Sequence, residues 1–209
     1  MSLQPHNTTQ ATPTSFPFNF SVPPNTDLWL KPAPIGGPPS SPPLISTSQP
    51  TFYTPLRLSS FIRAAVTVSF VPEHLYDQAG LALLFPADSS RWIKAGLEYV
   101  DEQAKRSVVV TTGGGEGADW SVAPPVEGSR DVDGTARTTV EFEREENGTG
   151  TSLFIKIGGE VVREVTWVFA APGNGEEEIW VGFYGARPAK EEAGQFPVVV
   201  EKWDVSVKV

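Results

Sequence analysis

Alternation of apolar and polar side chains over short segments is the feature that most constrains this fold. In residues 63–70, Ala64, Val66, Val68 and Phe70 lie on one side of an extended chain, and smaller residues lie on the other. No window repeats apolar residues at helical spacing over three turns. Twenty prolines and 19 glycines punctuate the alternating segments. The sequence therefore predicts many short strands joined by turns, and no long helix.

The strand signals pair into hairpins along the chain. Residues 80–85 and 92–100 flank a turn at 86–90, and residues 138–144 and 151–157 flank Asn147–Gly148. Further strand signals cover 107–112, 161–169, 179–186 and 198–209. These features predict an all-β fold, an antiparallel two-sheet β-sandwich of jelly-roll type, with an up-and-down barrel as the alternative.

The chain reads as one domain with an N-terminal extension. Residues 1–15 are polar and contain proline and threonine, so we expect a disordered tail. Residues 16–209 show no internal boundary and are predicted to form a single domain. Residues 32–43 hold six prolines and two glycines, which predicts a loop that cannot be a central strand.

Charge and cysteine content exclude several classes of function. The formal net charge of -9 disfavours nucleic acid and anionic membranes as partners. No apolar run reaches the length that a membrane span requires. Residues 1–20 lack the pattern of a signal peptide, and the chain has no cysteine, so we expect a cytoplasmic protein.

The residues of common catalytic and metal sites are largely missing. Without cysteine there is no thiolate ligand or nucleophile. His6 lies in the predicted tail and His74 in a loop, which disfavours a histidine-based catalytic or zinc site. The glycine run 113–117 lacks the Lys-Ser/Thr pair of a phosphate-binding loop. We therefore expect no catalytic residue, no metal and no cofactor.

Residues 92–99 combine a core face with an unusual opposite face. The core positions are Ile93, Ala95, Leu97 and Tyr99, and the opposite positions are Trp92, Lys94, Gly96 and Glu98. An aromatic ring, an ammonium and a carboxylate around a glycine are typical of a surface that binds a polar ligand. The alternative is a Lys94–Glu98 ion pair on the sheet surface, with Trp92 packed beneath a loop.

A set of motifs in fixed order carries a family resemblance. These are the segments 76–81 (YDQAGL), 92–98 (WIKAGLE), 107–111 (SVVVT), 119–121 (DWS), 163–165 (REV) and 181–188 (VGFYGARP). The set resembles the fungal regulation-of-enolase protein family, part of a broader bacterial and fungal family of largely unknown function. The resemblance implies a concanavalin A-like lectin/glucanase fold and a genetic link to the control of glycolytic enolase. The chain departs from the family pattern in its glycine-rich loop before Asp119 and in Arg187, where serine is expected.

These motifs predict one ligand-binding surface. In neighbouring strands, Trp92 would stack on a ligand while Lys94, Glu98 and Gln78 form hydrogen bonds with it. The full predicted set is Gln78, Trp92, Lys94, Glu98, Thr111, Asp119, Trp120 and Tyr184. For the 119–121 segment the alternative is structural, with Asp119 capping a turn and Trp120 closing the end of the sandwich.

The acidic segment 141–146 raises the possibility of a glycosidase site. Retaining glycosidases use two carboxyl groups about 5 Å apart, one as nucleophile and one as acid. Here the segment lacks the alternating apolar neighbours and ends at the Asn147–Gly148 turn, so we expect an exposed charged strand that blunts edge pairing.

Three hypotheses for function follow from the sequence. The leading one is a non-catalytic binding or regulatory protein that recognises a carbohydrate or small polar metabolite. The second is a protein-interaction factor for metabolic enzymes, acting through the proline-rich stretch 32–43. The third is a weak glycoside hydrolase.

Overall fold

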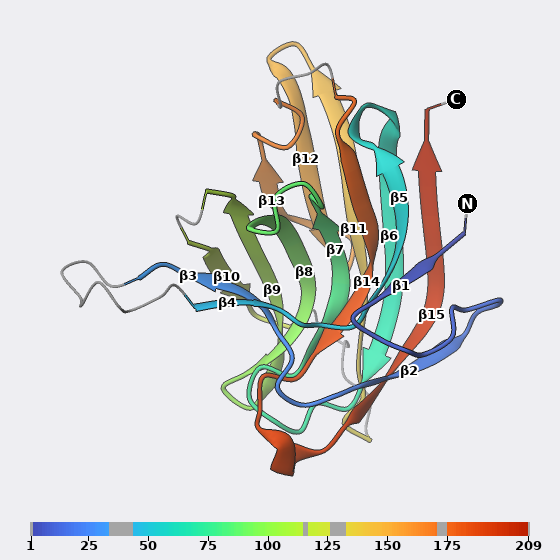
Figure 1. The fold of residues 1–209 in the computed structure, drawn as a ribbon, viewed down its shortest axis with the longest axis vertical. Helices are drawn as coiled ribbons and strands as arrows, with labels where there is room; N and C mark the ends of the chain where they lie inside the picture. Colours follow the sequence, from blue (N-terminus) through green and yellow to red (C-terminus); the bar gives the residue numbers. More distant parts are fainter. Residues whose placement is uncertain (1, 34–43, 115–116, 126–132, 171–174, 209) are drawn as a thin grey trace.

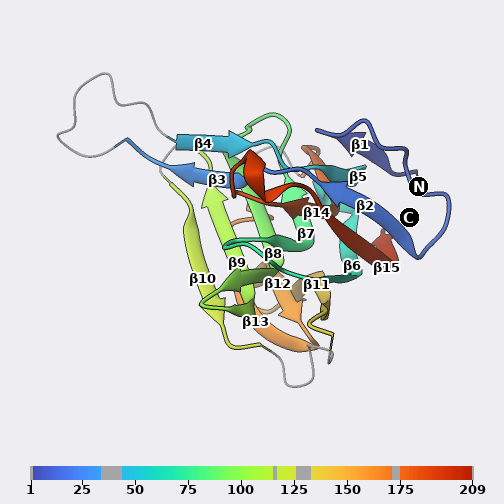
Figure 2. The same ribbon diagram turned by 90° about the horizontal axis from the view of Figure 1, so that it is seen from below.

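The chain folds into two stacked antiparallel sheets with a short hairpin laid on one of them (Figures 1 and 2). This computed structural model describes residues 2–33, 44–114, 117–125, 133–170 and 175–208. The only helical segments in these ranges are two single 3-10 turns, η1 (Leu58–Ser60) and η2 (Glu191–Ala193). Two separate sheets confirm the predicted β-sandwich over the barrel alternative.

The sheet order brings distant segments side by side. The seven-stranded sheet runs β1 (Gln4–His6), β5 (Thr51–Arg57), β14 (Glu178–Ala186), β7 (Gln78–Leu84), β8 (Arg91–Val100), β9 (Gln103–Thr112) and β10 (Asp119–Ala123). The six-stranded sheet runs β13 (Glu160–Val165), β12 (Gly150–Ile157), β11 (Ala136–Asn147), β6 (Phe61–Phe70), β15 (Phe196–Val207) and β2 (Phe18–Val22). The hairpin consists of β3 (Leu28–Lys31) and β4 (Leu44–Thr47).

The main core lies between the two sheets and contains the predicted apolar faces except Tyr99, which is only half-buried. Ile93, Ala95 and Leu97 of β8 pack in the same buried cluster as Val66 and Val68 of β6. Because side chains alternate along a strand, the intervening residues of β8 face away from this core. The outer face of the seven-stranded sheet is therefore the face that carries the polar motif.

The β3–β4 hairpin covers part of that outer face. Leu28 and Leu30 of β3 form a second buried cluster with Trp92 and Val109. The backbone N–H of Ala118, next to β10, donates to the carbonyl of Leu30 at 3.0 Å. The hairpin is thus fixed to the sheet by apolar packing and by a main-chain hydrogen bond.

The N-terminal residues differ from the expected disordered tail. Gln4 and His6 in β1 pair with Tyr53 and Thr51 of β5, and the His6 ring lies 5.2 Å from that of Trp180. Burial lowers the pKa of the His6 imidazole. Low hydrophobicity suggested disorder, but the segment is held by a sheet edge that only the tertiary structure supplies. Of the predicted loop 32–43, residues 34–43 lie outside the described part.

Two glycines let β7 and β8 approach closely beneath the polar motif. Gly80 and Gly96 lie opposite each other in register. A Cβ atom on Gly96 would lie 2.1 Å from the carbonyl oxygen of Ala79, which is backbone and cannot turn aside. Gly96 is thus required by strand packing. It also places no side chain on the sheet surface between Lys94 and Glu98.

We predict that Gly96→Ala destabilises the fold, whereas Gly148→Ala does not. The first adds a methyl group where no space exists, so the free energy of unfolding should fall by about 1–3 kcal/mol, the usual cost of overpacking. The second meets no atom within 4 Å. Chemical denaturation of both variants is the measurement, and equal stabilities would contradict the packing argument.

Candidate ligand-binding pocket

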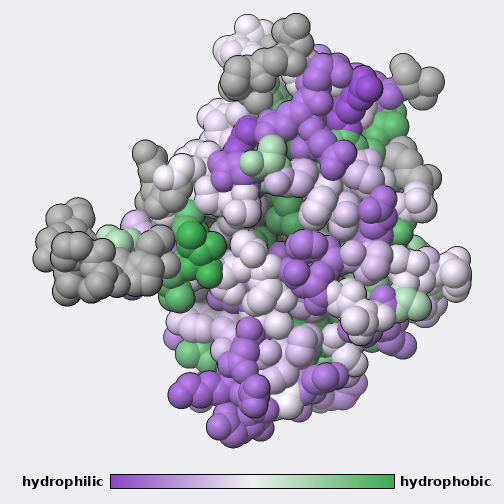
Figure 3. Space-filling view, viewed as in Figure 1, coloured by the Kyte–Doolittle hydropathy of each residue, from purple (hydrophilic) through white to green (hydrophobic). Residues whose placement is uncertain are grey.

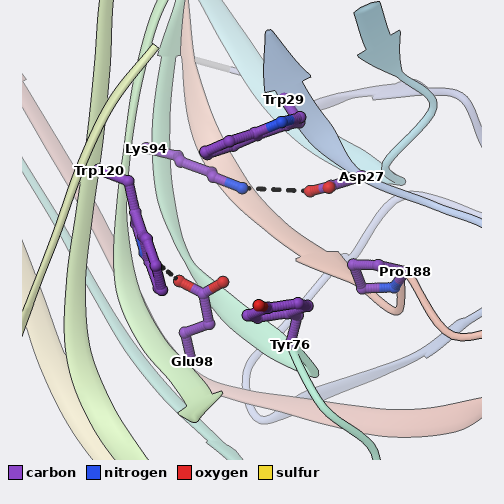
Figure 4. Close-up of a pocket in the computed structure, with 7 residues that line it drawn as sticks. All are labelled: Asp27, Trp29, Tyr76, Lys94, Glu98, Trp120 and Pro188. Atoms are coloured by element: carbon purple, nitrogen blue, oxygen red, sulfur yellow. Dashed lines mark hydrogen bonds and ion pairs between the residues drawn. The ribbon is translucent and has the colours of Figure 1, made fainter. Parts of the chain in front are cut away.

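A pocket of about 310 Å³ lies between the β3–β4 hairpin and the outer face of the seven-stranded sheet. Its lining consists of Asp27, Trp29, Tyr76, Lys94, Glu98, Trp120 and Pro188 (Figure 4). Three of these are aromatic and three are charged. The pocket therefore combines apolar walls with hydrogen-bonding groups.

Lys94 forms the polar floor together with side chains beneath it. Its Nζ donates to Gln78 Oε1 at 2.8 Å and to Asp27 Oδ1 at 3.2 Å. The hydroxyl of Tyr184 donates to the same Gln78 oxygen at 3.3 Å. Burial, and then the negative charges of Glu98 and Asp27, raise the pKa of Tyr184 well above its usual value. Tyr184 therefore remains a neutral donor, and the floor is a buried hydrogen-bonded network.

Glu98 accepts hydrogen bonds from neutral donors on the next two strands of the sheet, β9 and β10. The indole Nε1 of Trp120 in β10 donates to Glu98 Oε2 at 3.0 Å. The Ser107 hydroxyl of β9 donates to the same oxygen. Figure 4 shows the other carboxylate oxygen turned away from Trp120. The carboxylate is fixed in direction, and one of its oxygens faces the pocket.

The aromatic walls surround this polar floor. Tyr76 and Trp120 meet nearly at right angles, with ring centroids 6.1 Å apart. In Figure 4, Trp29 and Tyr76 lie on opposite sides of the Lys94–Asp27 pair, and Trp120 forms a third side. Aromatic faces accept C–H groups, while ionised and amide groups bind hydroxyls. The arrangement suits a small ligand with both kinds of surface.

A buried ion pair holds the rim of the pocket. Asp77 and Arg187 are both fully buried and form two hydrogen bonds, at 2.8 and 2.7 Å. Asp77 Oδ2 also accepts the backbone N–H groups of Glu73 and His74, each at 2.9 Å. These contacts fix the loop that presents Tyr76, whose φ is +68°.

Arg187 links that loop to the opposite rim. Its backbone N–H donates to Thr26 Oγ1 at 3.0 Å, and its carbonyl accepts the N–H of Thr26 at 3.0 Å. Asp27 and Pro188, the next residue on each segment, both line the pocket. Arg187, which stands where serine is expected, thus connects its own segment to the loop that contains Asp77 and to the segment that contains Thr26.

The structure brings together five of the eight predicted site residues. Lys94, Glu98 and Trp120 line the pocket, while Gln78 and Tyr184 lie beneath its floor. Lys94 pairs with Asp27, and the Lys94–Glu98 ion pair weighed as an alternative is not formed. Trp120 lines the pocket and is 36% exposed, so it does not plug the end of the sandwich.

Three predicted residues lie elsewhere. Trp92 is only 1% exposed and packs under the hairpin, so it presents no open plate for stacking. Thr111 lies opposite Trp92 in register and is buried. Asp119 pairs with Arg163 of β13 at 3.1 Å, outside the pocket. The expectation for Trp92 fails because strand alternation gives the face of a residue but not what covers it.

Four pocket residues, Asp27, Trp29, Tyr76 and Pro188, are absent from the set predicted from the sequence. Asp27 and Trp29 alternate with Leu28 and Leu30, which are buried. This alternation in the sequence indicates a strand with Asp27 and Trp29 on its outer face. What the sequence does not show is that this short strand lies across β8. Tyr76 was recognised only as part of a motif, because its place on the rim depends on the loop that Asp77 holds.

The acidic segment 141–146 lies on the other sheet. Glu141 and Glu143 face outward from β11, and they pair with Arg63 and Lys156. β11 has a neighbour on each side in the six-stranded sheet. The expectation that this strand protects an edge is therefore corrected: its charges form cross-strand pairs on an interior strand, away from the pocket.

The described residues show neither a metal-binding cluster nor a membrane-spanning helix. No group of three or more histidine, aspartate or glutamate side chains there is placed to hold a metal ion. None of the helices in the described ranges has the length and apolar character to cross a membrane.

Comparisons with known proteins place the chain beside fungal relatives. A family model described as "Protein of unknown function (DUF1349)" matches residues 5–207. An uncharacterized protein of Emericella nidulans is 31% identical over 82% of this chain and 78% of its own length. "Regulation of enolase protein 1" of Saccharomyces cerevisiae is 42% identical over 70% of this chain and 65% of its own length.

Solved structures share the fold. A functionally unknown protein from Saccharomyces cerevisiae superposes with a TM-score of 0.70 at 21% identity, covering 100% of this chain and 97% of that one. A xylan β-1,4-xylosidase from Bacillus halodurans superposes with a TM-score of 0.52 at 14% identity, covering 78% of this chain and 30% of the enzyme. At these identities the likeness concerns the fold alone.

We predict that Asp77→Asn strongly destabilises the protein. The change removes the buried counter-charge of the Arg187 guanidinium and leaves it only the exposed Glu73 carboxylate, 3.2 Å away; breaking a buried ion pair typically costs about 3–5 kcal/mol. Glu176→Gln is the control, since it removes one side of an exposed ion pair with Arg57 and should cost less than about 1 kcal/mol. Urea denaturation of both variants measures the difference, and similar losses would refute the role given to the buried pair.

We predict that Trp92→Ala destabilises the fold. Removal of this buried ring is expected to lower the free energy of unfolding by about 3–5 kcal/mol. Trp120→Ala should cost clearly less, because its ring is partly exposed. Thermal and chemical unfolding of the two variants provide the comparison, and a Trp92→Ala variant as stable as the parent would show that the ring is not a packing element.

Proposed function

The chain belongs to the DUF1349 family of proteins of unknown function, and we propose that it is a non-catalytic recognition protein. Its ligand would be a carbohydrate or another small polar metabolite, bound in the pocket between the β3–β4 hairpin and the seven-stranded sheet. The site residues of this proposal are Trp29, Tyr76 and Trp120 as walls and Asp27, Lys94 and Glu98 as polar contacts.

One observation carries the proposal: oriented polar groups lie at the base of an aromatic enclosure. An ammonium has three N–H donors. Lys94 uses two of them, one toward Gln78 and one toward Asp27, which leaves the third for a ligand oxygen. Glu98 offers an acceptor, and the three rings offer apolar faces. Since the network already holds Lys94 and Glu98 in place, binding requires little further ordering of these two side chains.

A catalytic role receives less support. Glu141 and Glu143 lie on the other sheet, away from the pocket, and are engaged in cross-strand ion pairs. The weak glycoside hydrolase hypothesis would then depend on Glu98 and Asp27. Turnover of β-glucans that disappears in Glu98→Gln would favour hydrolysis over recognition.

A second candidate function is interaction with a metabolic enzyme in the cytoplasm. It is supported by the name of the yeast relative, which refers to regulation of enolase. Leu44 and Ile45 of the hairpin are 62% and 49% exposed, and an apolar patch is visible where the hairpin lies (Figure 3). The proline-rich stretch 32–43 joins the two strands of this hairpin, although residues 34–43 are outside the described part.

Pull-down experiments separate this candidate from small-ligand recognition. The bait is the full chain, and the comparison is a double variant, Leu44→Ser with Ile45→Ser. Capture of enolase that is lost in the double variant, together with negative ligand screens, would favour the interaction function. Retained capture would show that this patch is not the contact surface.

We predict that Trp120→Ala weakens ligand binding at least about tenfold, or 1.4 kcal/mol, because it removes a pocket wall and a donor to Glu98. Val122→Ala is the control, since Val122 is comparably exposed and lies two residues further along the same strand. A glycan array and a thermal-shift metabolite screen identify ligands, and calorimetry gives the affinities. Equal binding by both variants would reject this pocket as the site.

A further inference from the structure

The charged side chains that line the pocket do not balance in sign. Two carboxylates and one ammonium line it, which leaves one net negative charge. Lys94 neutralises Asp27 through direct contact at 3.2 Å. Glu98, only 5% exposed, has hydrogen bonds from neutral donors alone among the described residues. The negative charge is therefore localised on Glu98.

A cationic residue on the neighbouring strand β9 pairs with another carboxylate. Lys105 lies opposite Glu98 in the β8–β9 register, so their side chains share a face. Its ammonium nevertheless pairs with Asp101 at 2.5 Å. A buried carboxylate without a cationic partner is costly, and a bound cation would remove that cost.

The surroundings of Glu98 favour a cation for a second reason. Aromatic faces attract ammonium groups electrostatically, most strongly where water is excluded. Tyr76 and Trp120 form two adjacent walls beside the carboxylate, and Trp29 faces Tyr76 across the pocket (Figure 4).

We infer that the pocket selects a ligand carrying a protonated amine, placed against Glu98 and between the rings of Tyr76 and Trp120. The rest of the ligand would carry hydroxyl groups, one of which accepts the remaining N–H of Lys94. A hydroxylated amine of the amino-sugar type has both features. This inference rests on the proposed function and narrows its ligand class.

The test compares sugars that differ at one substituent. D-glucosamine, D-glucose and N-acetyl-D-glucosamine are titrated into the unmodified full chain by calorimetry, at about pH 6.5, where an amine of ordinary pKa is protonated. D-glucosamine should bind at least about tenfold more tightly than the two neutral sugars. Glu98→Gln, which keeps the shape and removes the charge, should abolish this preference, so that the variant binds D-glucosamine no more tightly than D-glucose.

Each outcome separates the two proposals. Equal binding of charged and neutral sugars would overturn the amine inference and leave the recognition function standing. Binding of other, neutral compounds that depends on Trp120, without binding of D-glucosamine, would do the same. Absence of any ligand that depends on Trp120 would overturn both. If Glu98→Gln does not fold, the comparison of the three sugars on the unmodified chain still decides the question.

Discussion

The buried ion pair between Asp77 and Arg187 is the interaction on which the pocket depends. One carboxylate binds a guanidinium and two backbone N–H groups, and that arginine in turn contacts Thr26 and the turn at 193–194. Three segments far apart in sequence therefore meet at one point. Since the pair is sealed from solvent, loss of Arg187 leaves a buried carboxylate without a cation, and loss of Asp77 leaves the guanidinium only the exposed Glu73. Stability and the shape of the rim are coupled through this contact.

The hairpin β3–β4 turns an open sheet face into an enclosed site. Without it, Trp92 and Lys94 would both be exposed on the outer face of β8. The hairpin buries Trp92 beneath Leu28 and Leu30 and brings Asp27 onto Lys94. Neighbouring residues on the same strand face thus have different roles, with Trp92 packing and Lys94 lining the pocket. Gly96, which lies between Lys94 and Glu98 on the same strand face, adds no side chain there.

Much of this architecture could be predicted from local pattern, and the rest depended on long-range placement. Period-two alternation gave the hairpins and the core faces of β6 and β8, because one buried face suffices to reveal a strand. The same pattern placed Lys94 and Glu98 on the outer face. It could not reveal that a strand near residue 28 crosses β8, so Trp92 was expected to be open and Trp29 was missed. The strand at 4–6 was missed for the same reason, since a polar edge segment is ordered only by its partner.

The most direct test of the account is an NMR titration of the tryptophan indole N–H signals with D-glucosamine. The chain has six tryptophans, and single Trp→Phe variants assign their signals. The account predicts saturable shifts for Trp120 and Trp29, which line the pocket, and none for Trp203 on the other sheet. Saturable shifts confined to tryptophans outside the pocket would contradict the account as a whole, and the absence of any saturable shift would contradict the assignment of an amine-bearing ligand to this pocket.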